Sequence, residues 1–151
     1  MVQIFSSHPF YGKFVRLPSA DDPVPEFISG NSRFYPFFKD ALGALDCTHF
    51  PFTFPKAERQ ISRDRKGEST QNFLAACDFD LLFRYLVSGW EGSTSDSNVF
   101  LDSRMTDLVI PPGKYYLADA GFPNCNGLLT PYRGQRFNLK ESGPANLKYL
   151  N

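Results

Sequence analysis

The sequence predicts one α/β or α+β domain, in which helices cover a mixed β-sheet. At 151 residues the chain has the length of a single domain with a substantial hydrophobic core. Apolar segments of strand length come first, a segment with helical periodicity follows, and another apolar segment comes after it. Two of the apolar segments lead into an aspartate, Asp46 and Asp119, which raises the question whether the two carboxylates meet.

The composition is that of a globular protein rather than of one that coats nucleic acid. Hydrophobic residues make up 42% of the chain and charged residues 21%, and 16 basic residues balance 16 acidic ones. A local basic face remains compatible with this zero net charge. Three cysteines without CxxC spacing indicate a reduced, intracellular protein without a structural zinc site. We expect neither secretion nor membrane insertion, because no apolar run reaches membrane-spanning length and no signal-like segment opens the sequence.

The first third of the chain predicts a lead-in followed by strands. We expect residues 1–42 to form turns and short helices, because prolines recur in this part of the chain. The last of these helices is expected over residues 33–42. The main domain then covers residues 43–151 and starts with a strand through Asp46, and a second strand is expected to begin near Phe50.

The middle of the chain predicts a polar loop, a hairpin and a helix. Charged residues and serines predict a loop over residues 56–69, and two apolar segments, 72–79 and 81–88, predict a hairpin. A helix is expected over residues 98–107, after a turn rich in capping residues. Its expected apolar face consists of Val99, Phe100, Met105 and Leu108.

A further strand, expected over residues 114–118, leads directly into Asp119. If this strand lies beside the one through Asp46, the two carboxylates come close together. Two carboxylates about 5 Å apart repel by roughly 3 kcal/mol at an effective dielectric constant near 20. A shared proton or a divalent cation relieves that repulsion, and Mg²⁺ and Mn²⁺ prefer such oxygen ligands. The spacing alone still favours a simpler interpretation, in which each aspartate is a turn residue after a strand.

Other polar residues have two interpretations each. Asp96 is either a third acid or, as the sequence favours, the N-cap of the following helix. His49 is expected to be a packed or hydrogen-bonded histidine rather than a ligand. The basic cluster within residues 56–66, with Arg133 later, is compatible with contacts to phosphates, but its interleaved acids fit a solvated loop equally well.

The order of several segments resembles a known family. These segments are GALDCTHFPF, then SRDRKGESTQNFLAACDFDLLFRYLVSGWEGSTSDSNVF, then IPPGKYYLADAGFP and LLTPYRGQRFNLKE. In sequence and spacing they are similar to the DDE superfamily endonuclease domain of PIF/Harbinger-type transposases. The resemblance covers nearly the whole chain, and its specificity comes from the order of the motifs rather than from any one of them.

The resemblance implies an RNase H-like fold and a phosphodiester chemistry that uses two Mg²⁺ or Mn²⁺ ions to hydrolyse DNA ends and transfer strands. It implies that Asp46 and Asp119 are catalytic residues and metal ligands, and that Asp96, with His49 as a further candidate, supports the site through the ligands. We therefore expect DNA as a partner, a nuclear or cytoplasmic location, and a separate DNA-binding protein as a further candidate partner. The candidate contacts to the DNA backbone are Arg63, Arg65, Lys66 and Arg133.

The sequence departs from the family pattern at two places. Cys47 stands where the family has glycine after the first aspartate, and we expect the strand to tolerate this small residue. The family's third acid, a glutamate on a helix, would follow residue 151, because Glu141 precedes that helix in the order of motifs. We therefore expect a domain truncated at its C-terminus, with negligible cleavage by this chain alone. The alternatives are a catalytically inactive, transposon-derived fragment and a non-nuclease α/β domain whose two aspartates lie far apart.

Overall fold

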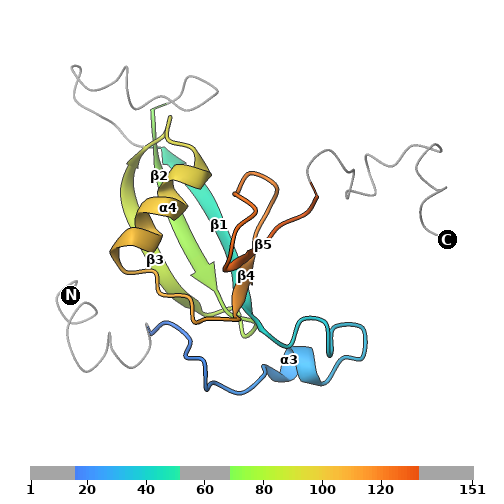
Figure 1. Cartoon of the computed structure of the whole chain (residues 1–151). Helices are drawn as coiled ribbons and strands as arrows, with labels where there is room; N and C mark the ends of the chain where they lie inside the picture. The colour runs from blue at the N-terminus through green and yellow to red at the C-terminus, as the bar shows by residue number, and fades with distance from the viewer. Residues whose placement is uncertain (1–15, 52–68, 133–151) are drawn as a thin grey trace, which may run out of the picture.

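The structure of the protein is a computed structural model that describes residues 16–51 and 69–132 (Figure 1). These residues contain one five-stranded sheet with the strand order β3-β2-β1-β4-β5. The strands are β1 (Ala41–Pro51), β2 (Thr70–Cys77), β3 (Phe83–Glu91), β4 (Tyr115–Leu117) and β5 (Leu128–Leu129). The helices of the described ranges are α3 (Glu26–Ser29) and α4 (Asp96–Thr106), and neither is long and apolar enough to cross a membrane.

The sheet is mixed. The first three strands pair in antiparallel fashion, whereas β4 and β5 extend the sheet in parallel on the other side of β1. The helix α4 follows β3 in the chain and lies across one face of the sheet before the chain enters β4 (Figure 1). This strand order and these directions are those of an RNase H-like fold, so the α/β fold class predicted from the sequence is confirmed.

The strand β1 is continuous over 11 residues. It pairs with β2 as far as the pair Pro51↔Thr70, so the prediction of a second strand near Phe50 is wrong. The reason is that β2 offers backbone partners along this whole segment, which outweighs the local tendency of prolines to interrupt a strand.

Gly43 allows β1 to approach β2 closely. Its φ is 153°, and the register between β1 and β4 shifts between Ala41 and Gly43. A Cβ atom at this position would lie 2.0 Å from the backbone oxygen of Cys77. Any side chain would therefore force the two strands apart at the start of their pairing.

The short helix expected over residues 33–42 is wrong. Residues 32–40 form successive turns, and β1 already begins at Ala41. Pro36 explains the difference, because it has no N–H to donate and disfavours a helical conformation of the residue before it. The expected boundary between the lead-in and the main domain, after residue 42, consequently falls inside β1.

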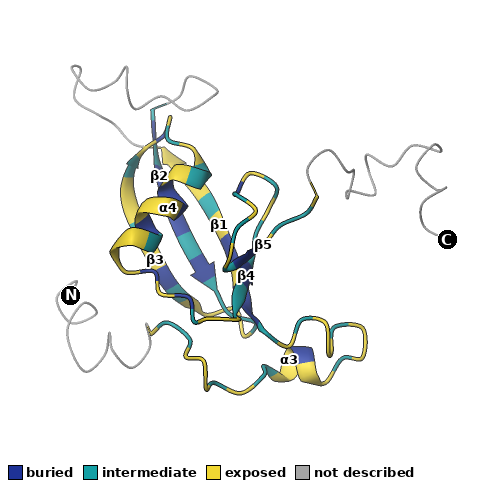
Figure 2. Ribbon diagram, in the orientation of Figure 1, coloured by how far each residue is buried: buried dark blue, intermediate teal, exposed yellow. Residues whose placement is uncertain are grey.

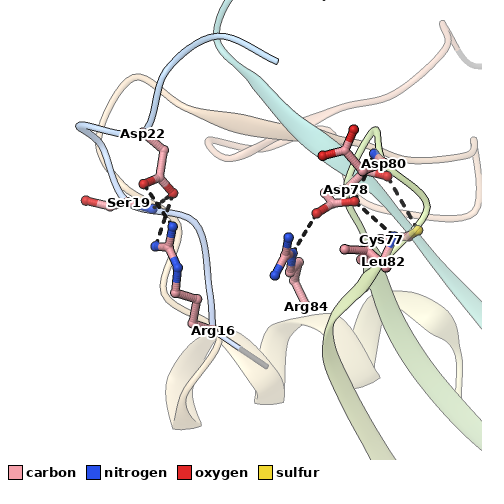
Figure 3. A network of polar contacts seen from close by, with 8 residues as sticks. All are labelled: Arg16, Ser19, Asp22, Cys77, Asp78, Asp80, Leu82 and Arg84. Atoms are coloured by element: carbon pink, nitrogen blue, oxygen red, sulfur yellow. Dashed lines mark hydrogen bonds and ion pairs between the residues drawn. The ribbon is translucent and has the colours of Figure 1, made fainter. Parts of the chain in front are cut away.

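The strands β2 and β3 form the expected hairpin, and Asp78 organises its turn (Figure 3). Its Oδ1 accepts hydrogen bonds from the backbone N–H groups of Asp80 and Leu82, each at 2.9 Å. Its Oδ2 accepts a hydrogen bond from Arg84 Nε at 2.6 Å. Burial raises the pKa of Asp78, but the hydrogen bonds from Leu82 and Arg84 outweigh it and leave the pKa below its ordinary value.

The helix α4 buries one stripe of side chains against the sheet (Figure 2). Val99, Phe100 and Ser103 are buried and share a face at helical spacing. Met105, predicted on the same face, is 88% exposed, because at 3.6 residues per turn it lies about 120° around the helix from Val99 and about 140° from Phe100. The core around this helix consists of Leu42, Leu45, Leu74, Ala76, Tyr85, Val99, Phe100, Leu108, Ile110, Tyr116, Phe122 and Leu128.

We predict that Gly43→Ala lowers the free energy of unfolding by at least about 2 kcal/mol, because the methyl group meets the Cys77 carbonyl and φ is strained. Gly89→Ala is the matched control, since its φ is 104° but no atom lies within 4 Å of the added Cβ. Urea unfolding measures both variants. Equal losses in the two variants would contradict the close approach of β1 to β2.

Candidate functional site

The parallel pairing of β1 with β4 brings Asp46 and Asp119 together. The last pair in this register is Ala44↔Leu117, and each aspartate lies two residues beyond its member of that pair. The two residues therefore stand at the same level of the sheet, where β4 has ended and β1 continues. The prediction that the two aspartate-bearing strands are neighbours is confirmed, although Asp46 lies within its strand rather than at its end.

Asp96 reaches the same place from α4. The N-cap of this helix is Ser95, whose extended backbone and Oγ, which accepts the Asn98 N–H, make it the capping residue. The prediction that Asp96 caps the helix is therefore wrong, because Asp96 is the first residue inside it. A Cβ built on Gly121 would lie 3.0 Å from Asp119 Oδ1 and 3.3 Å from Asp96 Oδ2, so both carboxylates border this glycine.

Each of the three carboxylates accepts a hydrogen bond from a nearby donor. Asp46 Oδ1 accepts the N–H of Cys47 at 2.8 Å, and Asp119 Oδ1 accepts the N–H of Gly121 at 2.8 Å. Asp96 Oδ1 accepts a hydrogen bond from Asn72 Nδ2 at 3.3 Å. Asp96 also lies at the N-terminus of α4, where the helix dipole favours negative charge.

The negative charges of the site shift the ionisation of their neighbours. Partial burial raises the pKa of Asp46, the N–H of Cys47 lowers it, and the charges of Asp119 and Asp96 raise it further. Burial also raises the pKa of the Cys47 thiol. The charge of Asp96 and the hydrogen bond that the thiol donates to this carboxylate raise it further, so the thiol stays protonated. The charges that act on Asp46 are both negative, so the site favours a bound cation.

The loop that carries Asp119 is fixed against α4. Ser97 Oγ donates a hydrogen bond to the Gly121 carbonyl oxygen at 3.0 Å. Phe122, which is 1% exposed, packs edge-on against Phe100 of the helix with ring centroids 6.3 Å apart. These contacts hold the first turn of α4 and the end of β4 in one rigid unit.

The remaining predicted site residues lie elsewhere. His49 is exposed on β1, three residues or roughly 10 Å along the strand from Asp46, and its Nδ1 is 3.2 Å from Thr70 Oγ1. This contact fits the hydrogen-bonded histidine expected from the sequence. The candidate DNA contacts lie outside the described residues: Arg63, Arg65, Lys66 and Arg133.

Sequence reasoning missed Asn72. It is the last of the three polar residues, Thr70, Gln71 and Asn72, that open β2 before its apolar part, so the sequence alone does not distinguish it from its neighbours. Its side chain is 0% exposed and reaches Asp96, which connects β2 to the carboxylate site.

The donor set fits a divalent cation in its chemistry. The carboxylate oxygens of Asp46, Asp119 and Asp96 are the ligand type that Mg²⁺ and Mn²⁺ prefer. Burial first, and then the charges of Asp119 and Asp96, raise the pKa of Asp46, and a cation would neutralise those charges. Within residues 16–51 and 69–132, however, no group of three or more His, Cys, Asp or Glu side chains is arranged closely enough to hold a metal ion. The described residues thus offer donors but not a complete metal centre.

Comparison with known proteins identifies the class to which this site belongs. The family described as DDE superfamily endonuclease matches residues 45–148, which include Asp46 and Asp119, and the chain belongs to this family. It is also similar to the protein ALP1-like of Arabidopsis thaliana, with 29% identity over 121 residues. The alignment covers 68% of this chain but only 30% of that relative. No solved structure matches the chain.

We predict that Asp46→Asn raises the free energy of unfolding of the protein at neutral pH in the presence of EDTA. The pKa of Asp46 is raised in the folded state, so its ionised form opposes folding. This cost is absent below the unfolded-state pKa of about 3.9 and develops as the pH rises through the folded-state pKa. Urea unfolding across this pH range measures the difference between variant and parent.

Asp78→Asn is the matched control with the opposite sign. The folded-state pKa of Asp78 is lowered, so its ionised form stabilises the fold at pH values above about 3.9. This stabilisation is lost as the pH falls through the folded-state pKa. Asp78→Asn should therefore destabilise the protein at neutral pH and have little effect in acid. Destabilisation by both variants at neutral pH would contradict a repulsive carboxylate cluster at Asp46.

Proposed function

We propose that the chain carries the metal-binding core of a DDE-type DNA nuclease or transposase, with Asp46 and Asp119 as the catalytic metal ligands. Membership of the DDE superfamily endonuclease family supports a nuclease-related role at the level of the family. The observation that carries the assignment to residues is the β1–β4 register, which sets the two carboxylates at the same level beyond Ala44 and Leu117.

Backbone N–H groups orient the carboxylates of Asp46 and Asp119 in the same way. In both Asp46 and Asp119 the Oδ1 atom is held by a backbone N–H, which orients the second oxygen of each carboxylate. Rigid orientation by the main chain suits ligands that must meet one ion. A bound Mg²⁺ or Mn²⁺ would supply Lewis-acid activation of a phosphodiester oxygen and of the attacking water or hydroxyl. Asp96 supports the pair from α4, next to Asp119.

The second candidate is a catalytically inactive, transposon-derived domain with a binding role or none. The observation in its favour is that the described part of the chain contains no group of three residues able to hold a metal ion. Two carboxylates bind a divalent ion weakly, and a second ion needs further ligands. This candidate predicts a folded protein that does not cleave DNA.

We predict that the protein binds Mn²⁺ and that Asp46→Ala and Asp119→Ala each abolish measurable binding, because each removes one of two ligands. The free Mn²⁺ signal in electron paramagnetic resonance measures binding directly. Asp21→Ala is the control, since it removes an exposed aspartate of the lead-in. Undiminished Mn²⁺ binding in both site variants would overturn the assignment of the ligands.

A plasmid-nicking assay with Mn²⁺ separates the two candidate functions. We expect this chain alone to nick supercoiled DNA negligibly. A version extended by a family-like C-terminal helix is expected to nick it measurably. Robust nicking by the chain alone, lost in Asp46→Ala, would overturn the inactive alternative. Failure of the extended version as well would count against the nuclease proposal. The proposal also includes DNA as the substrate, a nuclear or cytoplasmic location, and a separate DNA-binding protein as a candidate partner.

A further inference from the structure

Asn72 occupies a position in the sheet where a polar side chain is unusual. It lies near the start of β2, paired with His49 of β1 and Trp90 of β3. Its side chain is 0% exposed, on the face that α4 covers. Burying an amide is unfavourable unless its polar atoms find partners, so its presence here calls for a specific interaction.

The amide group of Asn72 is directed at the start of α4. Its Nδ2 donates to the Thr94 carbonyl oxygen at 3.3 Å and to Asp96 Oδ1 at 3.3 Å. Its Oδ1 is buried and has no hydrogen-bond partner among the described residues. The side chain thus satisfies its donors on the turn that carries Asp96, at the cost of an unpaired acceptor. An apolar residue of equal size would avoid that cost but could not hold Asp96.

The contact determines which oxygen of Asp96 faces the site. Asp96 Oδ1 is occupied by Asn72, and the other oxygen, Oδ2, borders Gly121 next to Asp119 Oδ1. Rotation of the Asp96 carboxylate would break the bond to Asn72. The Thr94 bond ties the preceding backbone to β2 as well, so both the main chain and the side chain of this turn are anchored to the same amide.

We propose that Asn72 is a positioning residue of the carboxylate site, which acts by holding Asp96 with its Oδ2 toward Asp119. The proposal rests on the proposed function, because positioning has a purpose only if the carboxylates receive a cation. It assigns Asn72 no contact with DNA or with the ion. Residues that orient ligands in this way typically change metal affinity by 10- to 100-fold when they are replaced.

The test compares Asn72→Leu with the parent protein in two measurements. The variant should bind Mn²⁺ at least about tenfold more weakly in electron paramagnetic resonance, because Asp96 loses the hydrogen bond that holds its Oδ1. Its midpoint of thermal unfolding in EDTA should change little, because removal of the unpaired buried acceptor offsets the loss of the two donor bonds to Thr94 and Asp96. A merely structural role predicts a lower midpoint with unchanged Mn²⁺ affinity. Gln71→Leu, one residue away on the other face of β2, is the matched control and should alter neither measurement.

A variant-free measurement covers the case in which Asn72→Leu does not fold. In the parent protein the side-chain amide signals of Asn72 should shift on titration with Mg²⁺, while those of Gln71 should not. Two results would overturn the positioning role while leaving the metal site intact. One is unchanged Mn²⁺ affinity in a folded Asn72→Leu variant, and the other is an Asn72 amide signal that does not shift on addition of Mg²⁺. A parent protein that binds neither ion would overturn the proposed function itself and this inference with it.

Discussion

The structure depends most on the parallel pairing of β1 with β4. This register, fixed by the pair Ala44↔Leu117, sets Asp46 and Asp119 at one level although 72 residues of chain separate them. The early end of β4 leaves room beside β1 for the loop that carries Asp119. Gly43 is part of the same constraint, because only glycine permits the close approach to β2 just before this pairing. The candidate site is therefore a consequence of how the sheet is assembled.

The site is held together against electrostatic repulsion. Each carboxylate receives a hydrogen bond, from Cys47, Gly121 or Asn72, and Asp96 benefits from the helix N-terminus. These donors do not remove the repulsion: burial is the largest cause that raises the pKa of Asp46, and the charges of Asp119 and Asp96 raise it further. Functional sites often lower the stability of the folded protein, as repulsion among these carboxylates does. A bound divalent cation would restore it by supplying the missing positive charge.

The order of apolar and polar segments was sufficient to predict the strand through Asp46, the hairpin, α4 and β4, but not β5, and the meeting of Asp46 with Asp119 was implied only by the family resemblance. It failed where tertiary contacts outweigh local preference: β2 extends β1 to Pro51, and residues 33–42 form turns and the start of a strand rather than a helix. Asp96 was misassigned as a cap because Ser95 and Asp96 are both capping residue types and only the backbone distinguishes them. Asn72 was missed because burial of a single polar residue is a property of the packed sheet, not of its own sequence neighbourhood.

The central claim is that Asp46 and Asp119 together form one cation site. Anomalous diffraction from crystals of the protein grown with Mn²⁺ tests it most directly, because the position of the ion is measured independently of any activity. We predict an anomalous peak between the two carboxylates, within about 2.0–2.6 Å of an oxygen of each. A peak would be absent from crystals of Asp46→Ala. An ordered structure in which Mn²⁺ binds elsewhere, or in which the two carboxylates diverge with no ion between them, would contradict the account.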